Sequence, residues 1–171
     1  MLIVQAQAMG MCFGVEDALK LAHSLPRPER VAILGEIVHN QQVQGRLLER
    51  GFTSQPEDQR HQLPQQPSVL ITAHGISDSY RQRLQQAEKE IIDTTCPLVA
   101  RVHKSARHLA TRGYRLVLVG KPGHVEVLGI TEDFPDTRVF AAPDQVDAGL
   151  GPKLAILAQT TTPPELFTRV S

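Results

Sequence analysis

Two cysteines are the side chains most able to do chemistry in this chain, and each stands between a predicted strand and a predicted helix. Cys12 follows an apolar run at 2–4, and Cys96 precedes a proline that opens a helical pattern. A thiol at a helix N-terminus faces unpaired N–H groups and the positive end of the helix dipole, which favour its thiolate. Thiolates attack electrophiles or bind metal, so both kinds of chemistry are open here.

Several alternatives for the cysteines can be weighed from the residues around them. A free cysteine is often a small buried hydrophobe, but the flanking Gly, Thr and Pro argue against burial inside an element. Neither cysteine has the C-x-x-C or H-x-x-H spacing of a zinc site or of a thioredoxin-like pair. Iron–sulfur ligation tolerates cysteines that are far apart in sequence, although two thiolates are fewer than its usual ligand set.

Polar clusters follow other predicted strands at the edge where open α/β sheets bind ligands. His39, His74 and His124 lie in these clusters, beside glycines or at helix starts, where they suit an anionic phosphate. Each histidine alone could be a helix cap or turn residue, but the shared location favours binding. The remaining histidines are predicted to lie on the solvated surface. They are His23, His61, His103 and His108.

Three further residues share the predicted edge. Glu126 is a candidate proton donor, because like charge from bound phosphate and thiolates would raise its pKa. The alternative is an acidic residue that favours the first turn of a helix. Thr160, with Gln159 beside it, could bind substrate through its hydroxyl or simply cap a helix ahead of the prolines at 163 and 164.

The elements that must position these residues alternate between apolar strands and helical segments, which predicts an α/β fold with short, mostly parallel sheets. A helix entered through prolines is also expected near the end of the chain. Helices are predicted at 15–24, 40–50, 77–88 and 97–112, the last with an apolar stripe of Leu98, Val102, Ala106 and Leu109. Strands are predicted at 2–6, 31–34, 68–72, 90–93, 115–119, 137–140 and 153–158.

A polar stretch at 52–67 is predicted to be a connector, so we expect one α/β unit at 1–67 and a second at 68–171. The 171 residues carry 18 basic and 18 acidic side chains, which suggests no attraction to nucleic acid or membranes. No apolar run is long enough to span a membrane, and the N-terminus is too short and uncharged for a signal peptide. A reducing, cytoplasmic location is therefore expected.

Taken together, the motifs resemble those of 4-hydroxy-3-methylbut-2-enyl diphosphate reductases, the LytB-type enzymes that end the non-mevalonate isoprenoid pathway. Gly-Met-Cys-Phe-Gly-Val around Cys12 resembles the family's Gly-Phe-Cys-x-Gly-Val, with Met11 in place of the usual aromatic residue. The other matching segments occur in the family's order and cover essentially the whole chain. They are 35–40, 73–77, 93–99, 123–129 and 159–161.

The resemblance implies an oxidoreductase that removes the hydroxyl of an allylic diphosphate to give isopentenyl and dimethylallyl diphosphate. It implies an oxygen-sensitive [4Fe–4S] cluster held by Cys12 and Cys96, with electrons from an external donor such as flavodoxin or ferredoxin. Glu126 would supply protons. The implied substrate-binding residues are His39, His74, His124, Thr160 and Gln159.

The resemblance also implies a trefoil of three similar α/β units, of which this chain holds two. The third cluster cysteine and later diphosphate contacts belong to the third unit. Two alternatives stay open. The first is an inactive two-unit relative that binds an anionic metabolite or a partner protein. The second is a thiol enzyme with Cys96 as nucleophile and His74 as a conceivable base.

Overall fold

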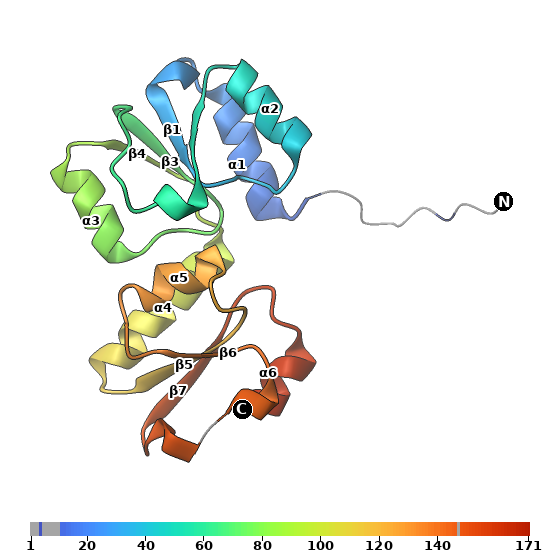
Figure 1. The fold of residues 1–171 in the computed structure, drawn as a ribbon, viewed down its shortest axis with the longest axis vertical. Helices are drawn as coiled ribbons and strands as arrows, with labels where there is room; N and C mark the ends of the chain where they lie inside the picture. Colours follow the sequence, from blue (N-terminus) through green and yellow to red (C-terminus); the bar gives the residue numbers. More distant parts are fainter. Residues whose placement is uncertain (1–3, 5–10, 147) are drawn as a thin grey trace.

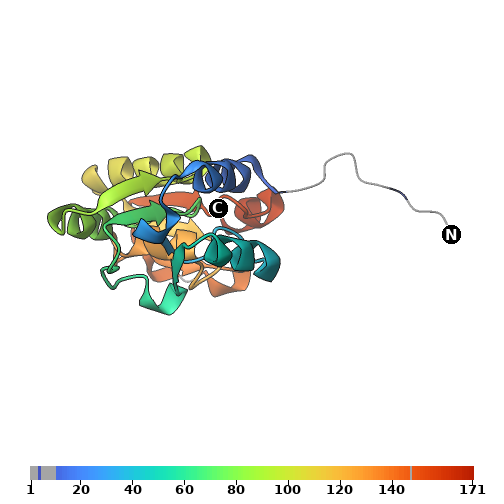
Figure 2. The same ribbon diagram turned by 90° about the horizontal axis from the view of Figure 1, so that it is seen from above.

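The computed structural model describes residues 4, 11–146 and 148–171, and folds them into two α/β units stacked along the longest axis of the molecule (Figures 1 and 2). The first unit has a four-stranded sheet in the order β2-β1-β3-β4, and the second has a three-stranded sheet in the order β6-β5-β7. All the pairings in both sheets are parallel. The predicted α/β class with short parallel sheets is confirmed.

Six of the strands fall where apolar runs predicted them, with ends that differ by one residue at most. The predicted strand at 2–6 lies outside the described residues, apart from residue 4. A seventh strand, β2 (Thr53–Gln55), lies inside the stretch predicted as a connector. The sequence did not reveal it because two of its three residues are exposed and no apolar run marks it. The other strands are β1 (Val31–Leu34), β3 (Ser68–Ile71), β4 (Glu90–Asp93), β5 (Arg115–Val119), β6 (Arg138–Phe140) and β7 (Leu154–Ala158).

The four longer helices begin and end within two residues of their predicted bounds, and a last helix follows the prolines as expected. Two of them begin at side-chain caps, because Asn40 accepts from the N–H groups of residues 42 and 43, and Ser77 accepts from that of residue 80. The helices are α1 (Phe13–Ser24), α2 (Gln41–Glu49), α3 (Asp78–Gln86), α4 (Pro97–Thr111), α5 (Val125–Thr131) and α6 (Pro164–Val170).

Each sheet is covered by helices on both faces, as the continuous apolar strands require. In the first unit, Ile33 and Leu70 pack with α1 and α2, whereas Leu34 and Ile71 pack with α3 on the other face. In the second unit, one core cluster joins α4 and α5 to the sheet, and another joins α6 to its opposite face. Both cores therefore hold their strands rigidly up to the edge where the loops begin.

The division between the sheets differs from the predicted boundary at residue 67. β3 and β4 lie beyond that residue but belong to the first sheet, where β3 pairs with β1 and β4 pairs with β3. The chain leaves this sheet after β4, and α4, which follows at once, packs on the second sheet. The polar composition of 52–67 reflects a loop between two strands of one sheet, not a link between units.

Helix α4 has a second buried face beside the predicted stripe, of which Val102, Ala106 and Leu109 pack in the core as expected. Leu98 is 48% exposed, whereas Val99, His103 and Ala106 are buried. The prediction that His103 lies on the solvated surface is therefore wrong: its ring lies against Gly129 of α5, which has no side chain to displace it. The helix has two buried faces, one toward its own sheet and one toward α5 and the first unit, and only the first gave an apolar pattern.

Candidate functional site

The strand orders of both sheets place the predicted site residues at topological switch points. In the first sheet, the chain moves from β1 to β2 on one side and then to β3 on the other, so the loops after β1 and β3 diverge. In the second sheet, β6 and β7 flank β5 in the same way. Ligands of open α/β sheets bind where such loops separate. The loops in question carry His39, His74, His124 and Gln159 with Thr160.

The two cysteines cap two helices that meet at this edge. Cys12 is the N-cap of α1 and Cys96 is the N-cap of α4, and neither side chain makes a capping hydrogen bond. Both thiols are free. Gly14, in the first turn of α1, lies so close to Cys96 that a Cβ there would be 3.0 Å from both the Cβ and Sγ atoms of the cysteine. The fold thus brings α1 against the second thiol.

His74 and His124 meet although they come from different units. Their rings are edge to face with centroids 5.6 Å apart. The Cys96 N–H donates to the carbonyl oxygen of Ala73 (3.0 Å), so the loop that carries His74 is attached to the second cysteine. The backbone of the second cysteine and the loop of His74 are therefore held together.

Both rings of this pair favour the neutral state. Burial, followed by the nearby charges of His124, His39 and Arg60, lowers the pKa of His74 from 6.5 to about 4. The pKa of His124 is lowered as well, first by burial. The Nδ1 atom of His124 accepts from the N–H of Glu126 (3.2 Å), which leaves its proton on Nε2 as a donor. A bound anion would oppose both shifts, because it favours the imidazolium form.

His39 is more exposed than the other two histidines and is held differently. Its Nδ1 lies 2.7 Å from the Oε2 atom of Glu36, in the turn that follows β1. The charge of His39 is one of the causes that lower the pKa of both other histidines. Glu36 orients the His39 ring and directs its Nε2 away from the turn.

Glu126 is buried, with 2% of its surface exposed, and both of its carboxyl oxygens are bonded to Thr160. The Thr160 N–H donates to Oε1 (2.7 Å) and the Thr160 hydroxyl donates to Oε2 (2.9 Å). The pKa of Glu126 is raised, mainly by burial, while the two Thr160 bonds act in the opposite direction. The upward direction of this pKa shift matches the expectation from the sequence. Its cause in this structure, however, is burial and not like charge.

The side chain of Gln159 joins two loops. Its Oε1 accepts from the N–H of Lys121 (3.0 Å) and its Nε2 donates to the hydroxyl of Thr161 (2.9 Å). Beside it, a cavity of about 310 Å³ is lined by residues of both loops, among them His124 and Thr161. A larger cavity of about 510 Å³ surrounds Tyr114 and Phe134 at the opposite end of β5, away from all of these residues.

The residues whose roles sequence reasoning missed are Glu36, Arg60 and Gly14. Arg60 has 4% of its surface exposed, and its guanidinium donates to the carbonyl oxygen of Val125 at the start of α5 (3.3 Å). Its position in a Gln-rich stretch gave no signal of burial. Gly14 and Glu36 lie inside the motifs quoted above. The sequence therefore identified the segments that contain them, but it did not predict their contacts.

The family model described as LytB protein matches residues 3–171. The chain belongs to the LytB family. Among curated LytB relatives, 4-hydroxy-3-methylbut-2-enyl diphosphate reductase of Pseudothermotoga lettingae is 35% identical and aligns with 94% of this chain. The reductase of Syntrophotalea carbinolica is 36% identical over the same share of the chain.

Solved LytB-family structures share the fold. The reductase of Plasmodium falciparum superposes with a TM-score of 0.81 at 28% identity over 96% of this chain. A structure described as the terminal enzyme of the non-mevalonate pathway gives 0.80 at 35% identity over 98% of it. The chain spans only about half of its LytB relatives: 57% and 58% of the two curated proteins, and 53% and 61% of the two solved chains.

Two observations bear on a metal group at this site. Among the described residues, no group of three His, Cys, Asp or Glu side chains is arranged to hold a metal ion. The two free thiols at adjoining helix N-termini nevertheless suit two positions in a thiolate ligand set. In the part of the chain that the structure covers, no helix is long and apolar enough to cross a membrane.

Proposed function

We propose that this chain carries the diphosphate pocket, the proton source and two cluster-binding thiols of a 4-hydroxy-3-methylbut-2-enyl diphosphate reductase. The observation that carries the proposal is the meeting of His74 and His124 from separate units at the edge that also holds both cysteines and the Glu126–Thr160 pair. This set offers anion donors, a protected carboxyl group and thiolates in one place.

The diphosphate would bind between the units. His124 presents its Nε2–H, and His74 can take up a proton when an anion arrives, because its low pKa comes from burial and positive neighbours. His39, fixed by Glu36, would approach from the loop after β1. Gln159 would act indirectly, because its amide already holds the two loops of the second unit together.

Proton supply would pass through the Glu126–Thr160 pair. Replacing a hydroxyl by hydrogen, with water as the other product, consumes two electrons and two protons. Glu126 has almost no exposed surface, whereas Thr160 is exposed, so a proton held at Glu126 would leave through the Thr160 hydroxyl. A hydroxyl can donate to a carboxylate and accept from a carboxylic acid, so the pair stays bonded in both states.

Cys12 and Cys96 would ligate an iron–sulfur cluster. When bound, a [4Fe–4S] cluster would supply electrons and a Lewis acid for the departing hydroxyl. The 171 residues contain two cysteines, so a third thiolate would come from outside them. A soluble electron donor such as flavodoxin or ferredoxin, and a cytoplasmic location, belong to the same proposal.

Anaerobic reconstitution with iron and sulfide tests the proposal. We expect bound iron that falls in Cys12→Ser and Cys96→Ser, and pyrophosphate binding that falls about tenfold or more in His74→Ala, since a buried charge-assisted contact is removed. His108→Ala, on an exposed turn of α4, is the matched control. Pyrophosphate binding without iron would favour the inactive relative, and the absence of both would contradict the assignment. Turnover of the allylic diphosphate with a chemical reductant would then test activity directly.

A further inference from the structure

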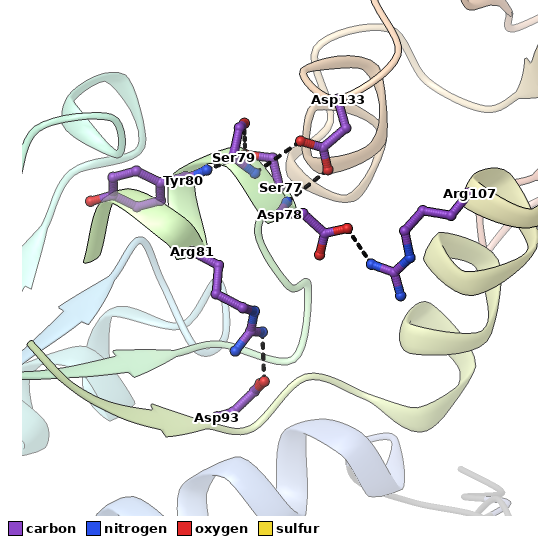
Figure 3. Close-up of polar contacts among 8 residues, drawn as sticks. All are labelled: Ser77, Asp78, Ser79, Tyr80, Arg81, Asp93, Arg107 and Asp133. Carbon is purple, nitrogen blue, oxygen red and sulfur yellow. Dashed lines mark hydrogen bonds and ion pairs between the residues drawn. The ribbon is translucent and has the colours of Figure 1, made fainter. Parts of the chain in front are cut away.

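The two units are joined at a cluster of charges that lies outside the proposed pocket. Figure 3 shows the carboxylate of Asp133, just after α5, directed at the first turn of α3 in the other unit. Its Oδ2 accepts from the N–H of Asp78 (2.7 Å) and its Oδ1 from the N–H of Ser79 (3.0 Å). The guanidinium of Arg107, on α4, pairs with the side chain of Asp78.

This arrangement is a helix cap supplied from another unit. The Ser77 hydroxyl accepts from the N–H of Tyr80, so the Asp133 carboxylate completes the first turn of α3. A carboxylate at a helix N-terminus gains from charge-assisted hydrogen bonds and from the helix dipole. The bonds therefore fix the end of α5 to the start of α3 in both distance and direction.

Short, rigid segments connect this cap to the histidine pair. On the first unit, Ser77 follows His74 by three residues, through Gly75 at φ +72° and buried Ile76. On the second unit, α5 runs between His124 at its N-cap and the Asp133 turn, where the Asp133 N–H donates to the carbonyl oxygen of Ile130 (3.2 Å). Seven helical residues span about 10 Å.

We propose that Asp133 is a positioning residue, which sets His74 against His124 by holding α5 of the second unit to α3 of the first. The proposal builds on the diphosphate site proposed above, although the geometry that it describes is independent of the ligand. A small change of angle at the cap would be carried along α5 to His124, while His74 stays attached to the first sheet. Misplacement by about 1 Å can cost up to about 100-fold in a site of this kind.

The test compares Asp133→Ala, Asp133→Asn and the control Asp136→Ala, which removes an exposed carboxylate three residues away. The first readout is the nuclear Overhauser effect between the ring protons of His74 and His124. The second is the affinity for inorganic pyrophosphate, measured well below the unfolding temperature. We expect Asp133→Ala to lose the ring contact and to bind pyrophosphate about tenfold more weakly. Asp133→Asn keeps one of the two acceptors, so it should retain part of the ring contact and part of the affinity, and Asp136→Ala should match the wild type.

The outcomes separate this proposal from the proposed function. If the ring contact and the affinity persist in Asp133→Ala while the first amides of α3 exchange faster, Asp133 is only a local cap and the proposal is overturned. If the ring contact is lost but the wild type does not bind pyrophosphate, Asp133 positions the histidines and the diphosphate site is wrong. Should Asp133→Ala fail to fold, Asp133→Asn decides: an unchanged ring contact and affinity overturn the proposal, and a partial loss of both supports it.

Discussion

At the residue scale, the pairing of Glu126 with Thr160 shows how the fold raises the pKa of a carboxyl group while leaving a route for its proton. Burial raises the pKa of Glu126, and the Thr160 bonds limit that shift. A buried carboxyl group with no hydrogen-bond partner would have a still higher pKa, but its proton would have no route to the site. The threonine thus gives the buried acid access to the exposed edge.

Glu126→Gln tests the burial of this acid. Because the folded-state pKa lies above the usual 4.5, the folded chain holds a proton that the unfolded chain releases. The stability from that proton is present below pH 4.5 and is lost as the pH rises through the folded pKa. Gln keeps both contacts with Thr160 and carries no charge, so the variant should unfold at a higher temperature than the wild type at pH 8. Its advantage should vanish near pH 4.

Calorimetric unfolding at a series of pH values makes this comparison. Glu165→Gln, at an exposed position in α6, is the control and should show no such dependence. If the unfolding temperature of Glu126→Gln exceeded that of the wild type by the same amount at pH 4 and at pH 8, the result would contradict the raised pKa of Glu126.

His74 should make anion binding stronger at low pH. Its pKa of about 4 means that the ring is neutral at pH 7, and a bound dianion would raise that pKa. Sulfate stays a dianion between pH 5 and 8, so its affinity should rise as the pH falls over that range. In His74→Gln the rise should be smaller, with His124 supplying the remainder. Isothermal titration of both proteins, with His108→Gln as control, would show this; a flat wild-type profile would speak against the site.

Sequence patterns predicted which residues gather at the edge but not how they are held. His74 and His124 could be placed there because each follows a predicted strand. Arg60 and His103 could not, since their burial depends on contacts with α5, which is far away in sequence, and no local pattern records such contacts. The same holds for Glu126, whose expected pKa shift had the right direction for a different reason.

At the element scale, two helix N-termini approach each other closely in the site. Gly14 of α1 lies against Cys96 of α4, with no room for a larger residue unless the thiol moves. The motif Cys-Phe-Gly therefore has a steric basis: the glycine two positions after the first cysteine makes room for the second. The predicted helix bounds were close enough to place both N-termini, but their contact depends on how the sheets stack.

Gly14→Ala should displace the Cys96 thiol. Alanine favours a helix interior over glycine by about 1 kcal/mol, but here its Cβ would lie 3.0 Å from Sγ. We expect the reaction rate of Cys96 with a thiol reagent to change at least severalfold while that of Cys12 changes little. Mass spectrometry of the labelled peptides would measure both rates.

Gly45→Ala is the matched control for this substitution. A Cβ at residue 45 of α2 would meet nothing within 4 Å, so the substitution should stabilise the fold by about 0.5–1 kcal/mol and leave both thiols unchanged. Equal thiol reactivity in the two variants would show that the contact at Gly14 does not matter.

At the scale of the whole molecule, Arg60 is a buried side chain that joins the two units. It extends from the loop between β2 and β3 to the carbonyl oxygen of Val125, and its charge also acts on His74. The predicted boundary at 67 assigned this loop to a connector. The sequence could not show that strands on both sides of it belong to one sheet, because pairing order leaves no local pattern.

Arg60→Met should weaken the association of the units. The substitution removes a buried hydrogen bond from a charged donor to the Val125 carbonyl oxygen, and the loss of such a bond costs about 1.5–3 kcal/mol. Urea unfolding should show that loss, and Arg101→Met on the exposed face of α4 should show almost none. A loss below about 0.5 kcal/mol would mean that water replaces the guanidinium at this carbonyl.

The contact between His74 and His124 also bears on the order of events during folding. The two rings come from different sheets, and 49 residues lie between them in the chain, so neither unit alone can produce the contact. Contacts that are distant in sequence form late because closing a long loop costs entropy before any interaction is gained. An intermediate with one finished unit would therefore carry both thiols without the histidine pair. The signal of the paired rings should be the last spectroscopic feature to appear on refolding.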